Sequence, residues 1–137
     1  MNINEAREYL YSLVGTPYLL GSADPMRGLD CYTLIKLFAL KMGVELPDLQ
    51  YSEDWASENP EFYSNGFKEY LKPVQPPFKT GDIILLRVYN AASHAGIILE
   101  DNKMIHATKI NGVMISSVNN NFYKKRIVSA GRFKQWL

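Results

Sequence analysis

Hydrophobic residues recur at helical spacing in two segments of the first third of the chain. From residue 3 to residue 14 they return every three or four positions, which predicts a helix that an early asparagine caps and Gly15 ends. Residues 31–42 show the same period, with Asp30 as the N-cap and Gly43 as the stop. We therefore expect two helices near the N-terminus.

Two connecting stretches lack a clear period. Residues 16–29 are polar and contain two glycines and two prolines, so they are predicted to form a long loop, and loops of that length are often functional. Residues 47–77 are less regular, although Asn59-Pro60-Glu61 has the cap, the first-turn proline and the acid of a helix start. We therefore expect a helical insertion at about residues 48–78.

After Gly81 hydrophobic and polar residues alternate, which is typical of strands. The predicted strands are residues 82–88, 94–99, 103–108, 113–118 and 126–130. Asn111-Gly112 predicts a two-residue hairpin turn in which both residues have positive φ. Helices followed by an antiparallel sheet of about five strands are typical of the α+β class, here in a single domain over residues 1–137.

Composition and charge narrow the class of protein. Of the 137 residues 47% are hydrophobic, which suffices for the core of one folded domain. The net charge is only +1, and the only dense basic run, residues 124–126, is interpreted as a solvated turn, so no nucleic-acid partner is expected. Membrane insertion and an export signal are not expected either, because the chain has no long apolar run and no basic-then-apolar N-terminus.

The chain contains one cysteine, Cys31, at the first position of the second predicted helix. A single cysteine excludes an intrachain disulfide and a zinc site built from cysteine pairs. At this position the free backbone N–H groups and the positive end of the helix dipole favour an anion, so the thiol ionises more easily. Because the thiolate is the nucleophilic form, Cys31 is a candidate catalytic residue.

The two histidines, His94 and His106, fall in neighbouring predicted strands and are twelve residues apart. Side chains alternate between the two faces of a sheet, so a hairpin loop with an odd number of residues places both histidines on one face. A three-residue loop at residues 100–102 meets this condition and puts His94 diagonally across from His106. The pattern therefore indicates a nucleophile, a base and an orienting residue.

Each of these residues also has a simpler interpretation. A single cysteine with apolar neighbours is commonly a buried spacer, and a histidine on a half-buried strand is commonly a hydrogen-bonded surface or core residue. Tyr18 and Tyr32 are two of nine tyrosines and can serve as packing residues. A Cys-His-His metal site is a further alternative, although zinc usually takes a fourth ligand or a water molecule.

Several short motifs stand in order along the chain. In the first third they are Gly-Thr-Pro-Tyr-Leu-Leu-Gly at residues 15–21, Gly-Leu-Asp-Cys at 28–31 and Gly-Val-Glu-Leu-Pro at 43–47. In the strand region they are Thr-Gly-Asp-Ile-Ile at 80–84, Ser-His-Ala-Gly-Ile-Ile-Leu at 93–99 and Met-Ile-His-Ala at 104–107. In order and spacing these motifs resemble the signature of the NlpC family of cell-wall cysteine peptidases. The resemblance covers residues 5–118, and the cysteine and both histidines stand at matching positions.

The resemblance implies a papain-like fold and assigns roles to the candidate residues. Cys31 matches the nucleophile, His94 the general base, and His106 the residue that orients His94. Tyr18 matches a tyrosine that lines the site and positions substrate or stabilises an oxyanion. Asp30 matches the acid before the cysteine, and we interpret it first as a helix cap.

Tyr32 and Ser93 complete the set of candidate substrate or oxyanion contacts, and the backbone N–H of Cys31 is the expected oxyanion donor. No metal or organic cofactor is expected. The chain departs from the family pattern by having Tyr32-Thr33 where many members have Ser-Gly, and Ser22 where many have a second glycine. Both departures are expected to line the cleft.

A longer connection also distinguishes the chain from compact secreted family members. Cys31 and His94 are 63 residues apart, and residues 51–77 account for the excess. Three features more closely resemble the phage tail-associated branch of the family: the sequence Asp-Cys-Tyr around Cys31, this insertion, and the closing residues 123–128. The chain is therefore expected to be associated with a phage particle or to be cytoplasmic, and to act at the cell wall after delivery.

The function implied by the resemblance is hydrolysis of an amide bond in peptidoglycan stem peptides, next to the γ-linked D-glutamyl residue. The residues themselves indicate only acyl transfer by a cysteine. Two alternatives stay open: a thiol amidase or acyltransferase on the same fold, and a non-catalytic module that binds a phage tail or the wall. The expected partners are a stem peptide as substrate and a phage tail or another delivery partner.

Overall fold

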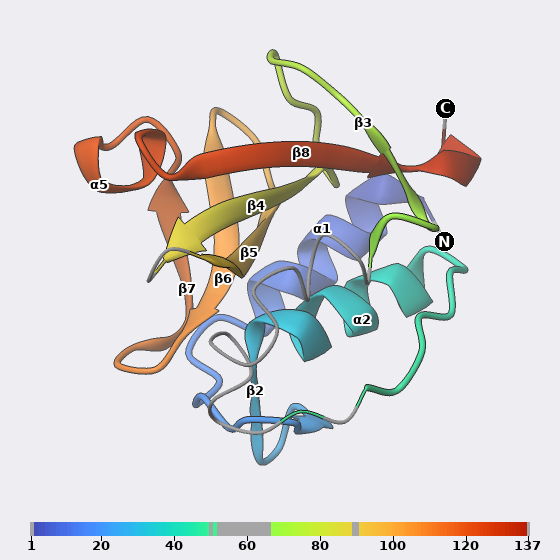
Figure 1. Cartoon of the computed structure of the whole chain (residues 1–137). Coiled ribbons are helices and arrows are strands. Elements are labelled where there is room, and N and C mark those ends of the chain that lie inside the picture. Colours follow the sequence, from blue (N-terminus) through green and yellow to red (C-terminus); the bar gives the residue numbers. More distant parts are fainter. Residues whose placement is uncertain (1, 50, 52–66, 89–90, 137) are drawn as a thin grey trace.

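Two helices cover one face of an antiparallel sheet in the computed structural model, which describes residues 2–49, 51, 67–88 and 91–136 (Figure 1). The sheet has six strands in the order β3-β8-β4-β5-β6-β7, and a separate two-stranded sheet joins β1 and β2. The predicted α+β class is confirmed. None of the described helices is long and apolar enough to cross a membrane.

The two predicted helices are confirmed. Helix α1 spans Ile3–Ser12, with the side chain of Asn2 accepting a hydrogen bond from the backbone N–H of Glu5. Helix α2 spans Cys31–Lys41 and begins with a capping box between Asp30 and Thr33. Helix α1 ends two residues before the predicted end and α2 one residue before it, and a glycine in the left-handed region, Gly15 or Gly43, follows each of them as predicted.

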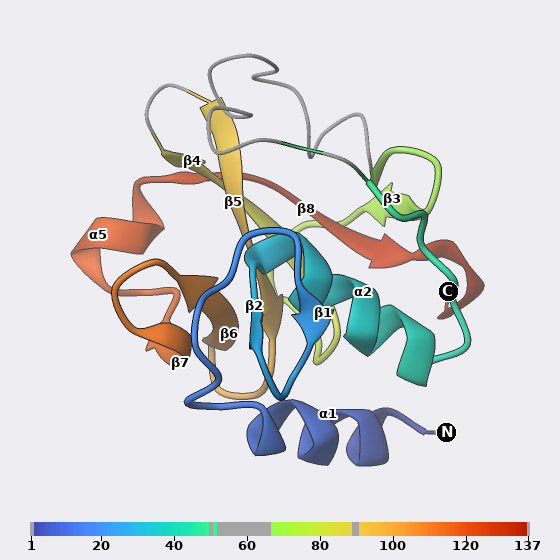
Figure 2. The same cartoon turned by 90° about the horizontal axis from the view of Figure 1, so that it is seen from below.

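The stretch predicted as a long loop contains a short hairpin instead. Strand β1 (Ala23–Asp24) pairs with β2 (Gly28–Leu29), and the hairpin lies beside the N-terminal end of α2 (Figure 2). The fully buried Leu29 organises this region, because its N–H donates to Pro17 O and its carbonyl accepts from Leu19 N. Strands of two residues are too short to show an alternating pattern, so the prediction of a loop over residues 16–29 was wrong in this part.

The five predicted strands are confirmed, with shifts of a few residues at their ends. They are β4 (Ile83–Val88), β5 (Ala91–Ile98), β6 (Lys103–Thr108), β7 (Gly112–Ser117) and β8 (Ile127–Phe133). The loop at residues 100–102 has three residues as predicted, since Leu99 N donates to Lys103 O across its base. The short helix α5 (Asn121–Lys124) lies between β7 and β8, and the 3-10 helix η1 (Lys134–Trp136) follows β8.

The sixth strand was not predicted. Strand β3 (Leu71–Pro73) pairs with β8 at the edge of the sheet, so the C-terminal part of the helical insertion expected at about residues 48–78 was wrong. An edge strand tolerates proline, because its outward N–H needs no partner in the sheet. Residues 52–66 of the expected insertion lie outside the described residues.

The turn predicted at Asn111-Gly112 was also wrong. Thr108 pairs with Gly112, so the hairpin loop consists of residues 109–111, and only Gly112 has positive φ. A tertiary contact sets this geometry, because Gly15 N donates to Val113 O and Val113 N donates to Thr16 O. The loop before β1 is thereby fixed to the start of β7.

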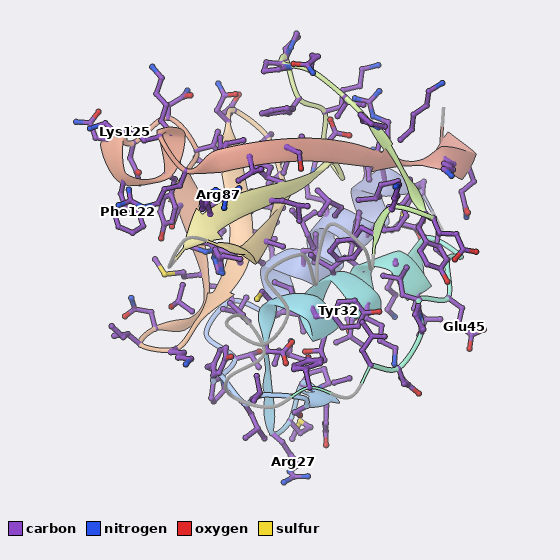
Figure 3. All side chains as sticks on the ribbon, in the orientation of Figure 1. Arg27, Tyr32, Glu45, Arg87, Phe122 and Lys125 are labelled. Carbon is purple, nitrogen blue, oxygen red and sulfur yellow. The ribbon has the colours of Figure 1, made fainter. Side chains whose placement is uncertain are left out.

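The basic run at residues 124–126, expected as a solvated turn, is partly helical. Lys124 is the last residue of α5, and Lys125 is its C-cap. Asn120 is the N-cap of this helix, and its side chain accepts a hydrogen bond from Tyr123 N at 2.8 Å. Figure 3 shows Phe122 and Lys125 at this outer corner of the molecule. The run is thus the link between α5 and β8.

The main core lies between the helices and the sheet. Alternate residues of β4 face opposite sides: Ile83 and Leu85 pack in the main core, whereas Ile84 and Leu86 belong to a smaller cluster on the other face. Met104 lies in this smaller cluster, whereas its neighbour Ile105 lies in the main core. The even-numbered residues of β6 therefore face away from the two helices.

Candidate active site

Cys31 is the first residue of α2, and only 6% of its surface is exposed. Helix α2 packs against β5 and β6, the two strands that carry the histidines. Cys31 belongs to the same buried cluster as Ala95 and Ala107, which directly follow His94 and His106 in the chain. The helix start and the two strands are therefore brought together, and the dipole of α2 favours a thiolate at Cys31.

Asp30 holds the helix start in place. Its carboxylate accepts hydrogen bonds from Thr33 N at 2.9 Å, from Gly21 N at 2.7 Å and from the Tyr51 hydroxyl. Only 2% of Asp30 is exposed, and a buried carboxylate needs several donors to be stable as an anion. The prediction that Asp30 is a helix cap is confirmed. The same side chain also holds the loop at Gly21 and the side chain of Tyr51 in place.

The two histidines are directly hydrogen-bonded. Nε2 of His94 lies 2.7 Å from Nδ1 of His106, and the two rings meet edge to face. The register Ile97↔Ile105 and Ile98↔Met104 continues to place His94 diagonally across from His106 on one face. The prediction drawn from the odd loop length is confirmed.

A serine extends this pair across a third strand. Nε2 of His106 lies 2.8 Å from Oγ of Ser116 on β7, and His106 is fully buried. The ring of Tyr123 from α5 packs edge-on against His106, with ring centroids 5.2 Å apart. Sequence reasoning missed Ser116 because a two-residue turn at Asn111-Gly112 would have placed Ser117 on the histidine face.

Burial keeps both imidazoles neutral near pH 7. It lowers the pKa of His94 to about 4. Burial and the nearby charge of His94 lower the pKa of His106 to about 3. A neutral imidazole is the form that a general base requires.

The alternative of a Cys-His-His metal site receives no support from this geometry. The facing nitrogens of His94 and His106 are at hydrogen-bond distance, which leaves room for a proton between them and not for a bridging metal. Within the part of the chain that the structure describes, no group of three histidine, cysteine or carboxylate side chains has the spacing of a metal site.

The segment that carries Cys31, His94 and His106 also matches a known protein family. Residues 15–132 match the sequence profile of the NlpC/P60 family. The chain belongs to the NlpC/P60 family. The expected resemblance is thus confirmed at the level of the family, whereas the assignment to its phage tail-associated branch stays a prediction.

Curated relatives of this NlpC/P60 chain carry names of wall hydrolases. It is 32% identical over 120 residues to the murein DD-endopeptidase MepS/murein LD-carboxypeptidase of Escherichia coli K12. The matched residues cover 86% of this chain and 56% of that protein. It is 30% identical over 134 residues to the probable peptidoglycan endopeptidase LytE of Bacillus subtilis 168, covering 97% and 35%. The chain therefore spans about half or less of these relatives.

Solved structures confirm the fold of the NlpC/P60 domain. A family protein from Bacillus cereus superposes with a TM-score of 0.76 at 17% identity, covering 97% of this chain and 40% of that chain. The NlpC/p60 domain of the peptidoglycan hydrolase SagA superposes with a TM-score of 0.68 at 21% identity, covering 97% and 100%. At these identities the comparison shows the fold alone.

Two tyrosines lie close to the helix start of this NlpC/P60 domain. Tyr18 is half-buried and forms an isolated bridge with Leu29, the residue before Asp30. Burial raises the pKa of Tyr51, and the hydrogen bond to Asp30 and the nearby Cys31 and Tyr18 raise it further. Tyr18, Tyr51 and Cys31 therefore share one neighbourhood, and the predicted role of Tyr18 toward substrate or an oxyanion stays a prediction.

Tyr32 is packed and not open to the cleft. Its hydroxyl donates to Pro47 O at 2.7 Å, and its ring contacts those of Tyr51 and Phe67. Burial raises the pKa of Tyr32 to about 12. With 3% exposure it joins α2 to the segment that follows it, and its predicted contact with substrate stays a prediction.

Ser93 lies in β5 beside His94. Its side chain is outside the part of the chain that the structure describes, so its predicted contact with substrate or an oxyanion also stays a prediction.

Proposed function

We propose that this chain is a cysteine peptidase that hydrolyses an amide bond in peptidoglycan stem peptides. The observation that carries the proposal is the His94–His106 hydrogen bond on the strands against which the Cys31 helix packs. A nucleophile at a helix start, a neutral base and a group that orients the base are the requirements for acyl transfer by a thiol. Membership of the NlpC/P60 family and the names of the relatives support peptidoglycan as the substrate class.

The first chemical step is formation of a thioester. His94 and His106 lie on the face of the sheet turned away from the main core, and the register of β5 shifts directly before His94, which is where a bulge re-aims a side chain. In this proposal Nδ1 of His94 takes the thiol proton of Cys31, because Nε2 contacts His106. The Sγ electron pair then attacks the amide carbon, and the carbonyl π pair moves to oxygen. The backbone N–H of Cys31 stabilises this oxyanion, because it stands at the start of α2, where the helix dipole is positive.

The second step releases the amine and then the acid. The oxyanion collapses, the C–N bond breaks, and protonated His94 gives its proton to the leaving nitrogen. His94 then takes a proton from a water molecule, whose oxygen attacks the thioester carbon. The C–S bond breaks, the Cys31 thiolate regains the proton from His94, and the acid product departs. Thiolate and imidazolium arise together, so burial penalises the pair less than it penalises a single charge.

For the bond itself we propose the γ-linked D-glutamyl amide. A relative at 28% identity over 134 residues is the gamma-DL-glutamyl hydrolase of Bacillus subtilis 168, covering 96% of this chain and 28% of that protein. The Escherichia coli relative is named a DD-endopeptidase, so cleavage of a D,D bond is the competing outcome.

The deciding experiment incubates purified stem peptides and crosslinked muropeptides with the chain and identifies products by mass spectrometry. A new amine one residue after D-glutamate supports the proposed bond, whereas cleavage of crosslinks alone replaces it with a D,D bond. Cys31→Ala should abolish cleavage, and its circular dichroism should match that of the wild type. Cleavage that survives in Cys31→Ala would contradict the proposed nucleophile.

A second experiment tests the thiol without a substrate. The rate of Cys31 alkylation by iodoacetamide is measured against pH in the wild type and in His94→Ala. We expect the wild type to react well below the ordinary thiol pKa of about 8.5, and His94→Ala to lose this advantage. An activated thiol that leaves stem peptides intact points to an amidase or acyltransferase. An ordinary thiol in both proteins points to a binding module.

We also propose that the chain is delivered by a phage tail or acts inside the cytoplasm. The proposal rests on the residues around Cys31, the insertion and residues 123–128. Mass spectrometry of purified phage particles from the source of this sequence is the test. Detection of the chain in particles supports tail association, and detection in the cytosol alone replaces it.

A further inference from the structure

Ser116 completes a row of three side chains that crosses three adjacent strands. His94 on β5 contacts His106 on β6 at 2.7 Å, and His106 contacts Ser116 on β7 at 2.8 Å. Each contact is diagonal: Ser116 pairs with Met104, and His106 pairs with Met114. The row therefore depends on the register of both hairpins.

Counting protons along this row fixes both histidine tautomers. A neutral imidazole carries one N–H, and the other ring nitrogen accepts. If Nδ1 of His94 is to receive the thiol proton, its own N–H is on Nε2 and donates to Nδ1 of His106. The N–H of His106 is then on Nε2, and it donates to Oγ of Ser116.

We propose that Ser116 is a positioning residue that anchors the His106 ring through Nε2 and thereby keeps His94 able to act as a base. The inference rests on the proposed function, in which His94 accepts the proton of Cys31. A hydroxyl can accept from an N–H or donate to a bare ring nitrogen, so the demand of Cys31 on Nδ1 of His94 sets the tautomer, and Ser116 supplies the acceptor that this tautomer needs. Loss of the hydroxyl would leave the buried Nε2–H unpaired, which weakens both the orientation of the ring and this tautomer.

The opposite tautomer would be unproductive. With its N–H on Nδ1, His106 would donate to Nε2 of His94, and the single N–H of neutral His94 would move to Nδ1. That nitrogen could then no longer take the thiol proton. A wrong histidine tautomer is known to impair catalytic triads of this kind.

Among the groups that face His106, Ser116 is the one that pairs with Nε2. From β5 the facing titratable group is His94, and from α5 it is Tyr123, whose ring packs against the imidazole. Among the described residues, burial and His94 account for the lowered pKa of His106, with no carboxylate contribution. The neutral hydroxyl of Ser116 is thus the hydrogen-bond partner of Nε2.

The chain offers a matched control on the same strand. Ser117 is exposed and lies on the opposite face from Ser116, and its hydroxyl accepts a hydrogen bond from Asn119 N. Ser117→Ala therefore removes the same atom from a neighbouring residue without touching the histidines. Ser116→Thr keeps the hydroxyl and suits a strand.

The experiment begins with the wild type and ¹⁵N NMR of its histidine rings above pH 7. We expect the proton of His106 on Nε2, and observation of it on Nδ1 would overturn the proposal. Because this measurement uses the unmodified chain, it remains decisive even if a variant fails to fold.

The variants then test the consequence for Cys31. In Ser116→Ala we expect the pH dependence of alkylation to move upward by about 0.5–1 pH unit, the equivalent of one neutral hydrogen bond, together with a second His106 tautomer. Ser116→Thr and Ser117→Ala should match the wild type. An unchanged profile and tautomer in Ser116→Ala would overturn the inference. An ordinary thiol in the wild type would instead overturn the proposed function.

Discussion

The hydroxyl of Tyr51 donates a hydrogen bond to Oδ2 of Asp30, the residue that caps the helix carrying Cys31. Asp30 is buried, so each of its donors offsets part of the free energy of removing a carboxylate from water. A residue that follows α2 in the chain therefore stabilises the start of the same helix.

Replacing Tyr51 by phenylalanine tests this relationship. We expect the free energy of unfolding to fall by about 1–2 kcal/mol, because a buried charged acceptor loses one donor. The matched control is Tyr11→Phe, which removes a hydroxyl donating to Glu100 at the exposed surface. Its loss should be well below 1 kcal/mol. Urea unfolding of both variants provides the measurement, and equal losses would contradict the importance of burial.

Gly112→Ala is expected to destabilise the chain far more than Gly43→Ala. Both glycines have left-handed backbones, with φ of +70° and +88°, so alanine is strained at each by about 1–2 kcal/mol. Only at Gly112 would the new Cβ meet backbone, 2.3 Å from Thr16 O, whereas nothing lies within 4 Å at Gly43. Thermal unfolding should separate the two variants by several degrees, about 1 kcal/mol or more.

The Gly112→Ala substitution should also change the geometry of the candidate active site. Thr16 and Pro17 must shift to make room, and Tyr18 follows them directly. We expect slower Cys31 alkylation or cleavage in Gly112→Ala at temperatures where the chain is folded. Unchanged rates would show that Tyr18 is positioned independently of the β6–β7 hairpin.

The lowered histidine pKa values predict a loss of stability in mild acid. In the unfolded chain histidine titrates near pH 6.5, whereas the folded pKa is about 4 for His94 and about 3 for His106. As pH falls from about 6.5 toward 4, the unfolded state binds protons that the folded state does not. The free energy of unfolding should therefore fall by up to about 1.4 kcal/mol per pH unit for each histidine. Above pH 6.5 this contribution is constant.

Urea midpoints between pH 7.5 and 5 measure this slope, and the double variant His94→Gln/His106→Gln is the control. It should keep only the shallower slope of the carboxylates. A wild-type slope equal to that of the double variant would show that the histidines titrate normally.

The strongest sequence predictions rested on local physical signals. Asp30 before an apolar helical stripe and Gly43 after it mark both ends of α2, because caps and left-handed glycines act within one turn. The His94–His106 pair was predictable because face parity depends only on the length of the 100–102 loop.

The errors arose where distant residues decide the local structure. The β6–β7 turn is set by contacts with Gly15 and Thr16, which no local motif reveals, and the wrong turn length hid Ser116. Strand β3 has three residues and depends on its pairing with β8, so its own sequence carries no alternating pattern. The contact of Tyr51 with Asp30 joins residues 21 positions apart across a stretch without a clear period.

The proposed catalytic pair is divided between two layers: Cys31 belongs to the helical layer and His94 to the sheet. Neither layer alone contains both the nucleophile and its base. A chain with formed helices and strands but an unpacked core is therefore expected to be inert. Docking of the two layers therefore decides when the site forms, so the proposed thiol–imidazole pair exists only in the completed fold.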